Sequence, residues 1–215
     1  MKRLTIRDPS TGTTVQASLF HPGQEGVREV YLCGFAPGEA AEQVLATRLN
    51  ESYGAALREL GLPNESAVIR RLHAPYSDTA GTTLAHCPLA QPGRGPEQTA
   101  VAIVGQPVRP GGGLGLWAYH LHEEEPLKKV PVEHGILIGR PGAKLMWQAG
   151  LPAEVQSPAD TAEQTEVAFG ACARELSERG GNVKDHLLRT WVFIDDIDRN
   201  YQPMSDTRRG LFKRL

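Results

Sequence analysis

Apolar side chains recur three or four positions apart over residues 42–60, which predicts a long helix with one buried face. The residues of this face are Val44, Leu45, Leu49, Tyr53, Ala56, Leu57 and Leu60. Gly61 follows the last of them, and Pro63 comes shortly after. A glycine in the left-handed conformation ends many helices, and a proline prevents the helix from resuming. The helix is therefore expected to end at residue 60.

Strands are predicted on both sides of this helix, from two-residue alternation and from short apolar runs. They cover residues 14–20, 29–33, 67–73, 99–104 and 114–121. The last two strands flank a glycine-rich turn at 110–113 and are expected to form a hairpin. Residues 75–97, which precede them, are rich in Gly, Pro, Thr and Ser and are expected to be irregular.

A second series of elements is predicted after residue 130. Strands are expected at 136–138, 144–148 and 187–194. A helix from Asp160 or Thr161 to about Glu178 precedes the last of them, and Gly180 and Gly181 end it. Its expected buried stripe consists of Phe169, Cys172, Ala173 and Leu176.

The chain is expected to close with a helix from Asp198 or Asn200 to Leu215, with Pro203 tolerated in its first turn. The apolar residues of one face are Tyr201, Met204, Leu211, Phe212 and Leu215. A helix with such a face needs a surface to cover.

Three short patterns occur twice and in the same order, which indicates two related units. They are an apolar run ending in glycine (30–34 and 145–150), Ala-Glu-Gln (41–43 and 162–164) and Arg-Glu-Leu (58–60 and 174–176). We expect an α+β fold of two tandem units, with helices packed on one face of a mixed sheet. The first unit spans 1–122, residues 123–130 link the two, and the second spans 131–215. The second has no counterpart of the closing hairpin and is expected to be incomplete.

Composition and charge argue against several classes of protein. The net charge of -2 leaves no basic face for a nucleic acid, and no apolar run is long enough for a membrane helix. The N-terminus lacks the apolar stretch of a signal peptide. Cys33, Cys87 and Cys172 are odd in number and far apart, so neither a disulfide framework nor a zinc ribbon is expected. We expect a cytoplasmic protein without a cofactor.

Two groups of side chains contain potential metal ligands. Asp195, Asp196 and Asp198 offer the carboxylate oxygens that Mg²⁺ prefers, but a polar loop that caps a helix is the favoured interpretation. His120 and His122 offer two zinc ligands on one strand, but no third His or Cys lies at a sequence spacing typical of a zinc site. No metal site is therefore expected.

The segment 189–197, Arg-Thr-Trp-Val-Phe-Ile-Asp-Asp-Ile, is followed by Tyr201 and by a helix with Arg208 and Phe212. This sequence resembles the YjgF-like or Rid family. It is most similar to the two-unit, chorismatase-like branch, in which a degenerate N-terminal unit precedes a C-terminal unit that holds the active site. The resemblance implies tandem units of the Rid-like, chorismate-mutase-like fold.

Residues 98–104 and 116–121 are similar to the closing hairpin of a Rid-like unit. The resemblance implies a hydrolase, because Rid proteins are trimers that hydrolyse enamines and imines in clefts between subunits, and chorismatases act on chorismate. Their catalytic glutamate lies in the closing hairpin of the active unit, which this chain lacks, so no catalytic residue is assigned. Val192 and Phe193 replace the Asn-Tyr pair that usually follows Arg-Thr-Trp in chorismatases, which removes a hydroxyl donor to the substrate.

The resemblance and the side-chain chemistry suggest six residues that bind a small carboxylate-bearing metabolite: Arg140, Arg189, Trp191, Phe193, Tyr201 and Arg208. Arg140 lies in a Gly-Arg-Pro-Gly turn, and its guanidinium either binds a carboxylate through two hydrogen bonds or is solvated. Arg189 precedes Trp191 on the same face of the predicted strand and either binds a ligand or covers a hydrophobic rim. The predicted protein is a chorismatase-like or Rid-like hydrolase in a trimer-like homo-oligomer. The alternative is a non-catalytic ligand-binding or assembly module.

Overall fold

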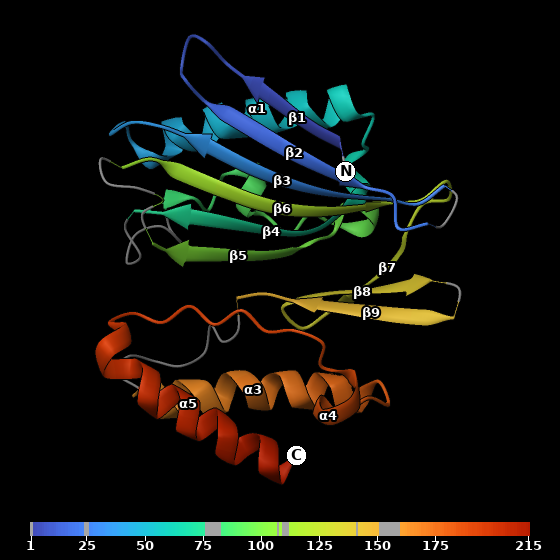
Figure 1. Ribbon diagram of the computed structural model, residues 1–215, viewed down its shortest axis with the longest axis vertical. Helices are drawn as coiled ribbons and strands as arrows, with labels where there is room; N and C mark the ends of the chain where they lie inside the picture. The colour runs from blue at the N-terminus through green and yellow to red at the C-terminus, as the bar shows by residue number, and fades with distance from the viewer. Residues whose placement is uncertain are drawn as a thin grey trace. The chain divides into compact units, whose positions relative to one another are not determined.

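The computed structural model describes residues 2–23, 26–75, 83–106, 108, 112–140, 142–150 and 160–215. The chain divides into two compact units, Met1–Ala149 and Gly150–Leu215. Figure 1 labels their helices and strands. The α+β class with a mixed sheet is confirmed. The tandem repeat, with its link at 123–130, stays a prediction.

The first unit contains a six-stranded mixed sheet in the order β1-β2-β3-β6-β4-β5. The strands are β1 (Lys2–Arg7), β2 (Thr14–Phe20), β3 (Arg28–Ala36), β4 (Ala67–Ala74), β5 (Ala100–Gly105) and β6 (Leu114–His122). Neighbouring strands are antiparallel except β4 and β5, which run parallel. The predicted positions of β2 to β6 are confirmed within one to three residues, whereas β1 has no counterpart among the predicted strands.

The predicted hairpin of β5 and β6 is wrong, because β4 lies between these two strands. The reason is burial: Leu114, Leu116 and Leu121 of β6 are at most 3% exposed, so β6 takes a central place covered on both faces. The predicted irregular stretch before β5 contains two short 3-10 helices, η2 (Pro88–Ala90) and η3 (Gly95–Glu97). Residues 76–82 of that stretch lie outside the described residues.

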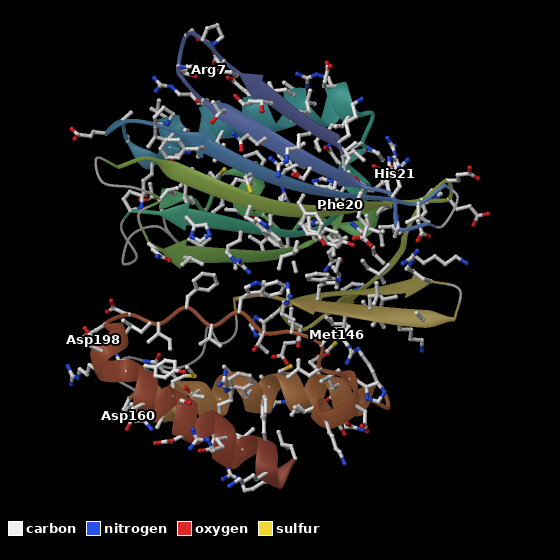
Figure 2. The ribbon with its side chains drawn as sticks, viewed as in Figure 1. Arg7, Phe20, His21, Met146, Asp160 and Asp198 are labelled. Carbon is white, nitrogen blue, oxygen red and sulfur yellow. The ribbon has the colours of Figure 1, made fainter. Side chains whose placement is uncertain are left out.

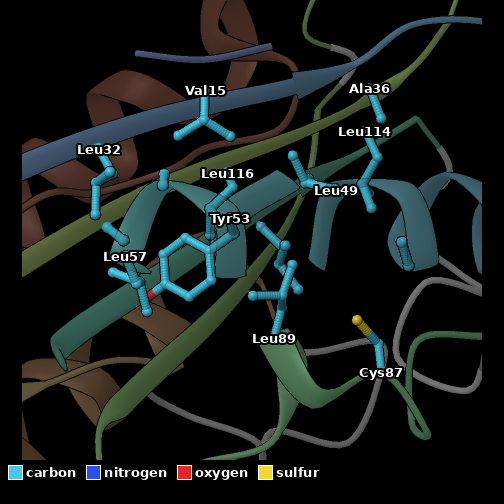
Figure 3. Packing of buried hydrophobic residues seen from close by; sticks show 14 of the residues in the cluster. Val15, Leu32, Ala36, Leu49, Tyr53, Leu57, Cys87, Leu89, Leu114 and Leu116 are labelled. Atoms are coloured by element: carbon cyan, nitrogen blue, oxygen red, sulfur yellow. The ribbon is translucent and has the colours of Figure 1, made fainter. Parts of the chain in front are cut away.

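Helix α1 (Glu42–Leu60) covers one face of the six-stranded sheet and has the predicted bounds. Its apolar residues Leu49, Tyr53 and Leu57 pack against side chains of the strands, as Figure 3 shows. Gly34 allows the close approach, since a Cβ at this position would lie 2.8 Å from the Leu49 side chain. Gly61 ends the helix in the left-handed conformation, with φ of 59°.

A three-stranded antiparallel meander covers part of the opposite face of the same sheet. Its strands are β7 (Lys128–Val132), β8 (Gly135–Arg140) and β9 (Ala143–Gln148). Ile136 and Ile138 of β8 are fully buried and pack in one cluster with Ile69, Tyr119 and Leu121 of the larger sheet. The meander therefore belongs to the first compact unit, and the larger sheet lies between it and α1.

The second unit consists of three helices in its described part: α3 (Thr161–Glu178), α4 (Val183–His186) and α5 (Ile197–Arg214). Asp160, labelled in Figure 2, caps α3 by accepting a hydrogen bond of 2.8 Å from the backbone N–H of Glu163, which confirms the predicted start. Phe169 of α3 meets Phe212 of α5 edge to face, with ring centroids 5.2 Å apart. Of the predicted stripe of α3, only Phe169 is buried, and the other buried residues of the helix are Thr165, Ala171 and Glu175.

The predicted strand at 187–194 is wrong: these residues form no strand. Leu188 is 87% exposed, and Trp191, Val192 and Phe193 are exposed by more than 40%. A strand is stabilised by hydrogen bonds to a neighbouring strand, and the described part of this unit provides none. Helix α5 starts at Ile197, slightly before the predicted residues. Among the described helices, none combines the length and the apolar character that a membrane span requires.

Candidate functional site

The outer face of the six-stranded sheet is the face opposite α1. Its centre carries aromatic and cationic side chains. Alternation along each strand places every second residue on this face. Cys33 of β3 stands opposite Trp117 of β6, and Trp117 stands opposite Arg71 of β4. Tyr31 and Tyr119 form the next pair of β3 and β6 on the same face.

Aromatic rings follow one another across the outer face. The rings of Tyr31 and Tyr119 are stacked with centroids 4.8 Å apart, and Tyr119 also lies 5.2 Å from Trp147 of the meander. Phe20, labelled in Figure 2, meets Tyr31 edge to face at 5.5 Å, and Trp117 lies 6.2 Å from Tyr31. Packing fixes the positions of these rings, since Tyr119 is 5% exposed and Tyr31, Trp117 and Trp147 are partly buried against the same cluster.

Arg71 lies over the ring of Trp117, with its guanidinium carbon 5.1 Å from the ring centroid. Burial lowers the pKa of Arg71, whose side chain is 8% exposed, yet an arginine remains charged in proteins. Burial and the nearby charge of Arg71 lower the pKa of His73, two residues further along the same face. The outer face therefore combines a fixed cation with an imidazole that is neutral near pH 7 and able to accept a proton.

Arg140 is the last residue of β8 and pairs with a carboxylate of its own chain. Its Nε lies 2.5 Å from Oε1 of Glu123, and both side chains are about one-fifth exposed, at 20% and 21%. The pKa of Tyr119 is raised by burial first, and then by the charge of Glu29 and a hydrogen bond to it. The charge of Arg140 lowers this pKa. A carboxylate ligand that binds Arg140 therefore has to compete with Glu123 or to share the guanidinium with it.

The other predicted binding residues lie in the second unit. The guanidinium carbon of Arg189 lies 5.5 Å from the ring centroid of Trp191, so the structure brings this predicted pair together. Phe193 is 44% exposed and Tyr201 is 51% exposed, while Arg208 of α5 is half-buried. Their roles in binding stay predictions.

Two of the residues considered for metal ions, Asp195 and His120, take part in hydrogen bonds within the fold. The described residues contain no cluster of three His, Cys, Asp or Glu side chains that could hold a metal ion. Asp196 directly precedes α5, and the backbone oxygen of Asp195 accepts a hydrogen bond of 2.7 Å from Asn200. His120 is fully buried, so it cannot serve an open metal site.

A serine and a histidine also meet in the interior of the first unit. Ser66 Oγ lies 2.8 Å from Nδ1 of His120, at a distance typical of a nucleophile and its base. Ser66 is 2% exposed and His120 is fully buried, so a substrate cannot reach either of them. This pair is part of the core of the first unit.

Sequence reasoning missed Arg71, His73 and Trp117 as candidate residues. A signal was present, because Arg70 and Arg71 interrupt an otherwise apolar strand. Alternation sends these two arginines to opposite faces, and only the structure shows which face carries the aromatic row. Arg70 points to the α1 side, where it donates hydrogen bonds of 3.1 and 2.7 Å to the carbonyls of Pro88 and Gln91.

No protein-family model matches the chain, and no curated protein matches it. Two solved structures are similar to it at low identity. One is a crystal structure of a chorismatase, with 16% identity and a TM-score of 0.46, covering 86% of this chain and 68% of that one. The other is a proposed translation initiation inhibitor from Salmonella typhimurium, with 10% identity and a TM-score of 0.36, covering 55% of this chain and 96% of that one. Similarity at this level assigns no activity to the chain.

Proposed function

We propose that the protein binds a small carboxylate-bearing metabolite on the outer face of its six-stranded sheet. The observation that carries the proposal is the placement of Arg71 over Trp117 within a row of aromatic rings. A guanidinium held over an indole attracts a carboxylate, and the neighbouring rings suit a planar, unsaturated body. Arg189 with Trp191 repeats the same pairing in the second unit.

The six residues suggested by the resemblance stay proposed ligand contacts of their own units, Arg140 in the first and the other five in the second. They are Arg140, Arg189, Trp191, Phe193, Tyr201 and Arg208. A trimer-like homo-oligomer is likewise proposed, on the resemblance alone. Light scattering of the purified chain tests it, and a monomer at micromolar concentration would contradict it.

Binding is tested with chorismate, pyruvate and benzoate as probes, by calorimetry at low salt. Arg71→Gln removes the cation but keeps a polar side chain of similar length, so affinity for the best probe should fall by about tenfold or more. The matched control is Arg58→Gln, an exposed arginine on α1, which covers the opposite face. Equal loss in both variants, or no binding of any probe at millimolar concentration, overturns the proposal. Thermal unfolding of each variant separates lost binding from lost folding.

A second candidate function is hydrolysis of an enamine, imine or chorismate-type substrate, and His73 is the observation that favours it. Its imidazole, with a lowered pKa next to Arg71, can accept a proton from water. In imine hydrolysis the water oxygen adds to the imine carbon, His73 takes the released proton, and nitrogen leaves as ammonia after receiving protons. The Arg71 guanidinium would hold the substrate carboxylate during this step.

Turnover is measured as ammonia release from a 2-aminoacrylate-type enamine and, separately, as loss of chorismate absorbance. His73→Asn should abolish turnover while affinity changes less than threefold, because the amide cannot accept a proton at neutral pH. Turnover that survives in His73→Asn rejects His73 as the base. Probe binding without turnover by the wild-type protein leaves the ligand-binding module as the function.

A further inference from the structure

Lys129 of β7 connects the meander to two separate parts of the six-stranded sheet. Its Nζ donates one hydrogen bond of 2.5 Å to the carbonyl of Ala67, the first residue of β4. It donates a second, of 2.9 Å, to the carbonyl of Gln98, just before β5. One half-buried side chain therefore holds β7, β4 and the η3–β5 connection together.

The hydrogen bonds at this position use two of the three directions of the nitrogen, whether it is a neutral amine or an ammonium group. An ammonium group has three donors, whereas a neutral amine has two donors and one lone pair. Both hydrogen-bond partners of Lys129 are carbonyl oxygens, which accept two hydrogens. Among the described residues, no carboxylate lies within ion-pair distance of Nζ to stabilise the third proton. The third direction of the nitrogen is therefore where a lone pair would point.

The charges around Lys129 also favour the neutral form. Burial first, and then the charge of Arg70 on β4, lower the pKa of Lys129 to about 8, against the opposing effect of Glu65 on the short helix η1 (Asn64–Ser66) and Glu97 on η3. His120 on β6 is neutral in the same neighbourhood. The lowered pKa raises the fraction of Lys129 that carries a lone pair at a given pH, and this is the nucleophilic form of a lysine.

We propose that Nζ of Lys129 is a nucleophilic amine that an activated acyl donor, either an acyl phosphate or a thioester, converts to an amide. The nitrogen lone pair attacks the acyl carbon and forms a C–N bond. The C–O bond to phosphate or the C–S bond to the thiol breaks, and the leaving group keeps the electron pair. The nitrogen releases one proton to water, so the step needs no oxidant or reductant.

Acylation would weaken the attachment of the meander. An amide nitrogen has one hydrogen, so either Ala67 or Gln98 loses its donor, and the acyl group needs space at a half-buried position. The meander covers the apolar cluster around Ile69 and Tyr119 on the outer face. Modification of Lys129 would therefore expose part of the face on which the proposed ligand site lies.

The reactivity of Lys129 is tested on the full chain with acetyl phosphate in one arm and acetyl coenzyme A in the other, from pH 6.5 to 9.5. Lys128 is the matched internal control, because it precedes Lys129 on β7 and is exposed on the other side of the strand. Tandem mass spectrometry, with Lys128→Arg and Lys129→Arg to assign the signals, gives the two rates. At pH 8, Lys129 should react at least about fivefold faster than Lys128, with a rate that levels off above this pH.

A rate at Lys129 equal to or below that at Lys128 with both donors overturns the proposal. Reaction with one donor alone identifies the source of the acyl group. Hydrogen exchange then tests the structural consequence: stoichiometric acetylation of Lys129 should speed exchange of the β8 amides by about tenfold or more. Unchanged exchange in the acetylated protein would show that the meander stays attached and would reject that part of the proposal.

Discussion

The hydroxyl oxygen of Tyr53 lies 2.7 Å from Nε2 of His120 in the core of the first unit. On the other side of the imidazole, Ser66 Oγ lies 2.8 Å from Nδ1 and donates its own hydrogen to the carbonyl of Pro63 at 2.7 Å. Because this hydrogen is used, Nδ1 carries the imidazole proton and donates to Ser66, and Nε2 accepts from Tyr53. One hydrogen-bonded chain thus joins α1, β6 and the short helix η1 (Asn64–Ser66).

Replacing Tyr53 by Phe should destabilise the first unit, because Nε2 of His120 would be a buried acceptor without a donor. The expected loss in the free energy of unfolding is about 1–3 kcal/mol. Urea unfolding followed by circular dichroism measures it. Tyr201→Phe is the control, because Tyr201 is 51% exposed, and it should change stability by less than about 0.5 kcal/mol. Equal stability of Tyr53→Phe and the wild type would contradict the hydrogen-bond assignment.

The protein should become less stable as the pH is lowered from about 6.5, in part because of His120. Burial first, and then the charges of Arg70 and Lys129, lower the pKa of His120 to about 3. Unfolded histidine has a pKa of about 6.5, so between these values the unfolded chain binds a proton that the native state does not. The stabilisation is complete above pH 6.5 and is lost as the pH falls toward 3.

The pH dependence is checked by denaturant unfolding at a series of pH values and by NMR titration of the imidazole C–H signals. The signal of His120 should not move between pH 7.5 and 5. A titration midpoint near 6.5 for His120 would show that the imidazole is not held neutral. Tyr53→Phe should alter the titration of His120, since its neighbour at Nε2 is removed.

Gly135, the first residue of β8, should not tolerate a side chain. A Cβ at this position would overlap the backbone carbonyl of Trp147, and a backbone atom cannot rotate away as a side chain can. Gly135→Ala should destabilise the meander by about 1–3 kcal/mol. Gly139→Ala in the same strand is the control, because its Cβ would lie 4.0 Å from the nearest heavy atom, the carbonyl oxygen of Lys128. Hydrogen exchange of the β8 and β9 amides measures both, and equal effects would contradict the prediction.

Glu123→Gln should raise the affinity for a carboxylate ligand that binds Arg140, because it removes the anion that now lies 2.5 Å from Nε. The expected gain is about threefold to tenfold for the best probe, and Arg140→Gln should lower affinity instead. Calorimetry on both single variants and on the double variant measures the coupling. If both Glu123→Gln and Arg140→Gln leave the affinity for the best probe unchanged, Arg140 is not a ligand contact.

Local sequence signals were sufficient for the helices, because the determinants lie within the elements themselves. The spacing of Leu49, Tyr53 and Leu57 predicts α1, and Gly61 ends it in the left-handed conformation that the sequence implies. Asp160 caps α3 as predicted. Each of these features depends on side chains or backbone groups a few residues apart.

Strand order and strand pairing could not be predicted from local patterns. Nothing near Ala100 shows that β5 pairs in parallel with β4 rather than with the next strand along the chain. The apolar run at 187–194 has the composition of a strand, but composition cannot supply the neighbour that a strand requires. The candidate site shows the same limit, because Arg71 and Trp117 are far apart in sequence and meet only through the register of β4 and β6.

The sequence by itself determined where the long helices begin and end, and which strand residues alternate toward each face. These features follow from backbone preferences and side-chain spacing within a few turns or strand repeats. The tertiary structure alone decided that β6 lies in the centre of the sheet, that the meander covers part of the outer face, and that Tyr53, His120 and Ser66 share one buried chain of hydrogen bonds. Those arrangements depend on contacts between distant segments, which form only when the apolar faces of the elements are buried together.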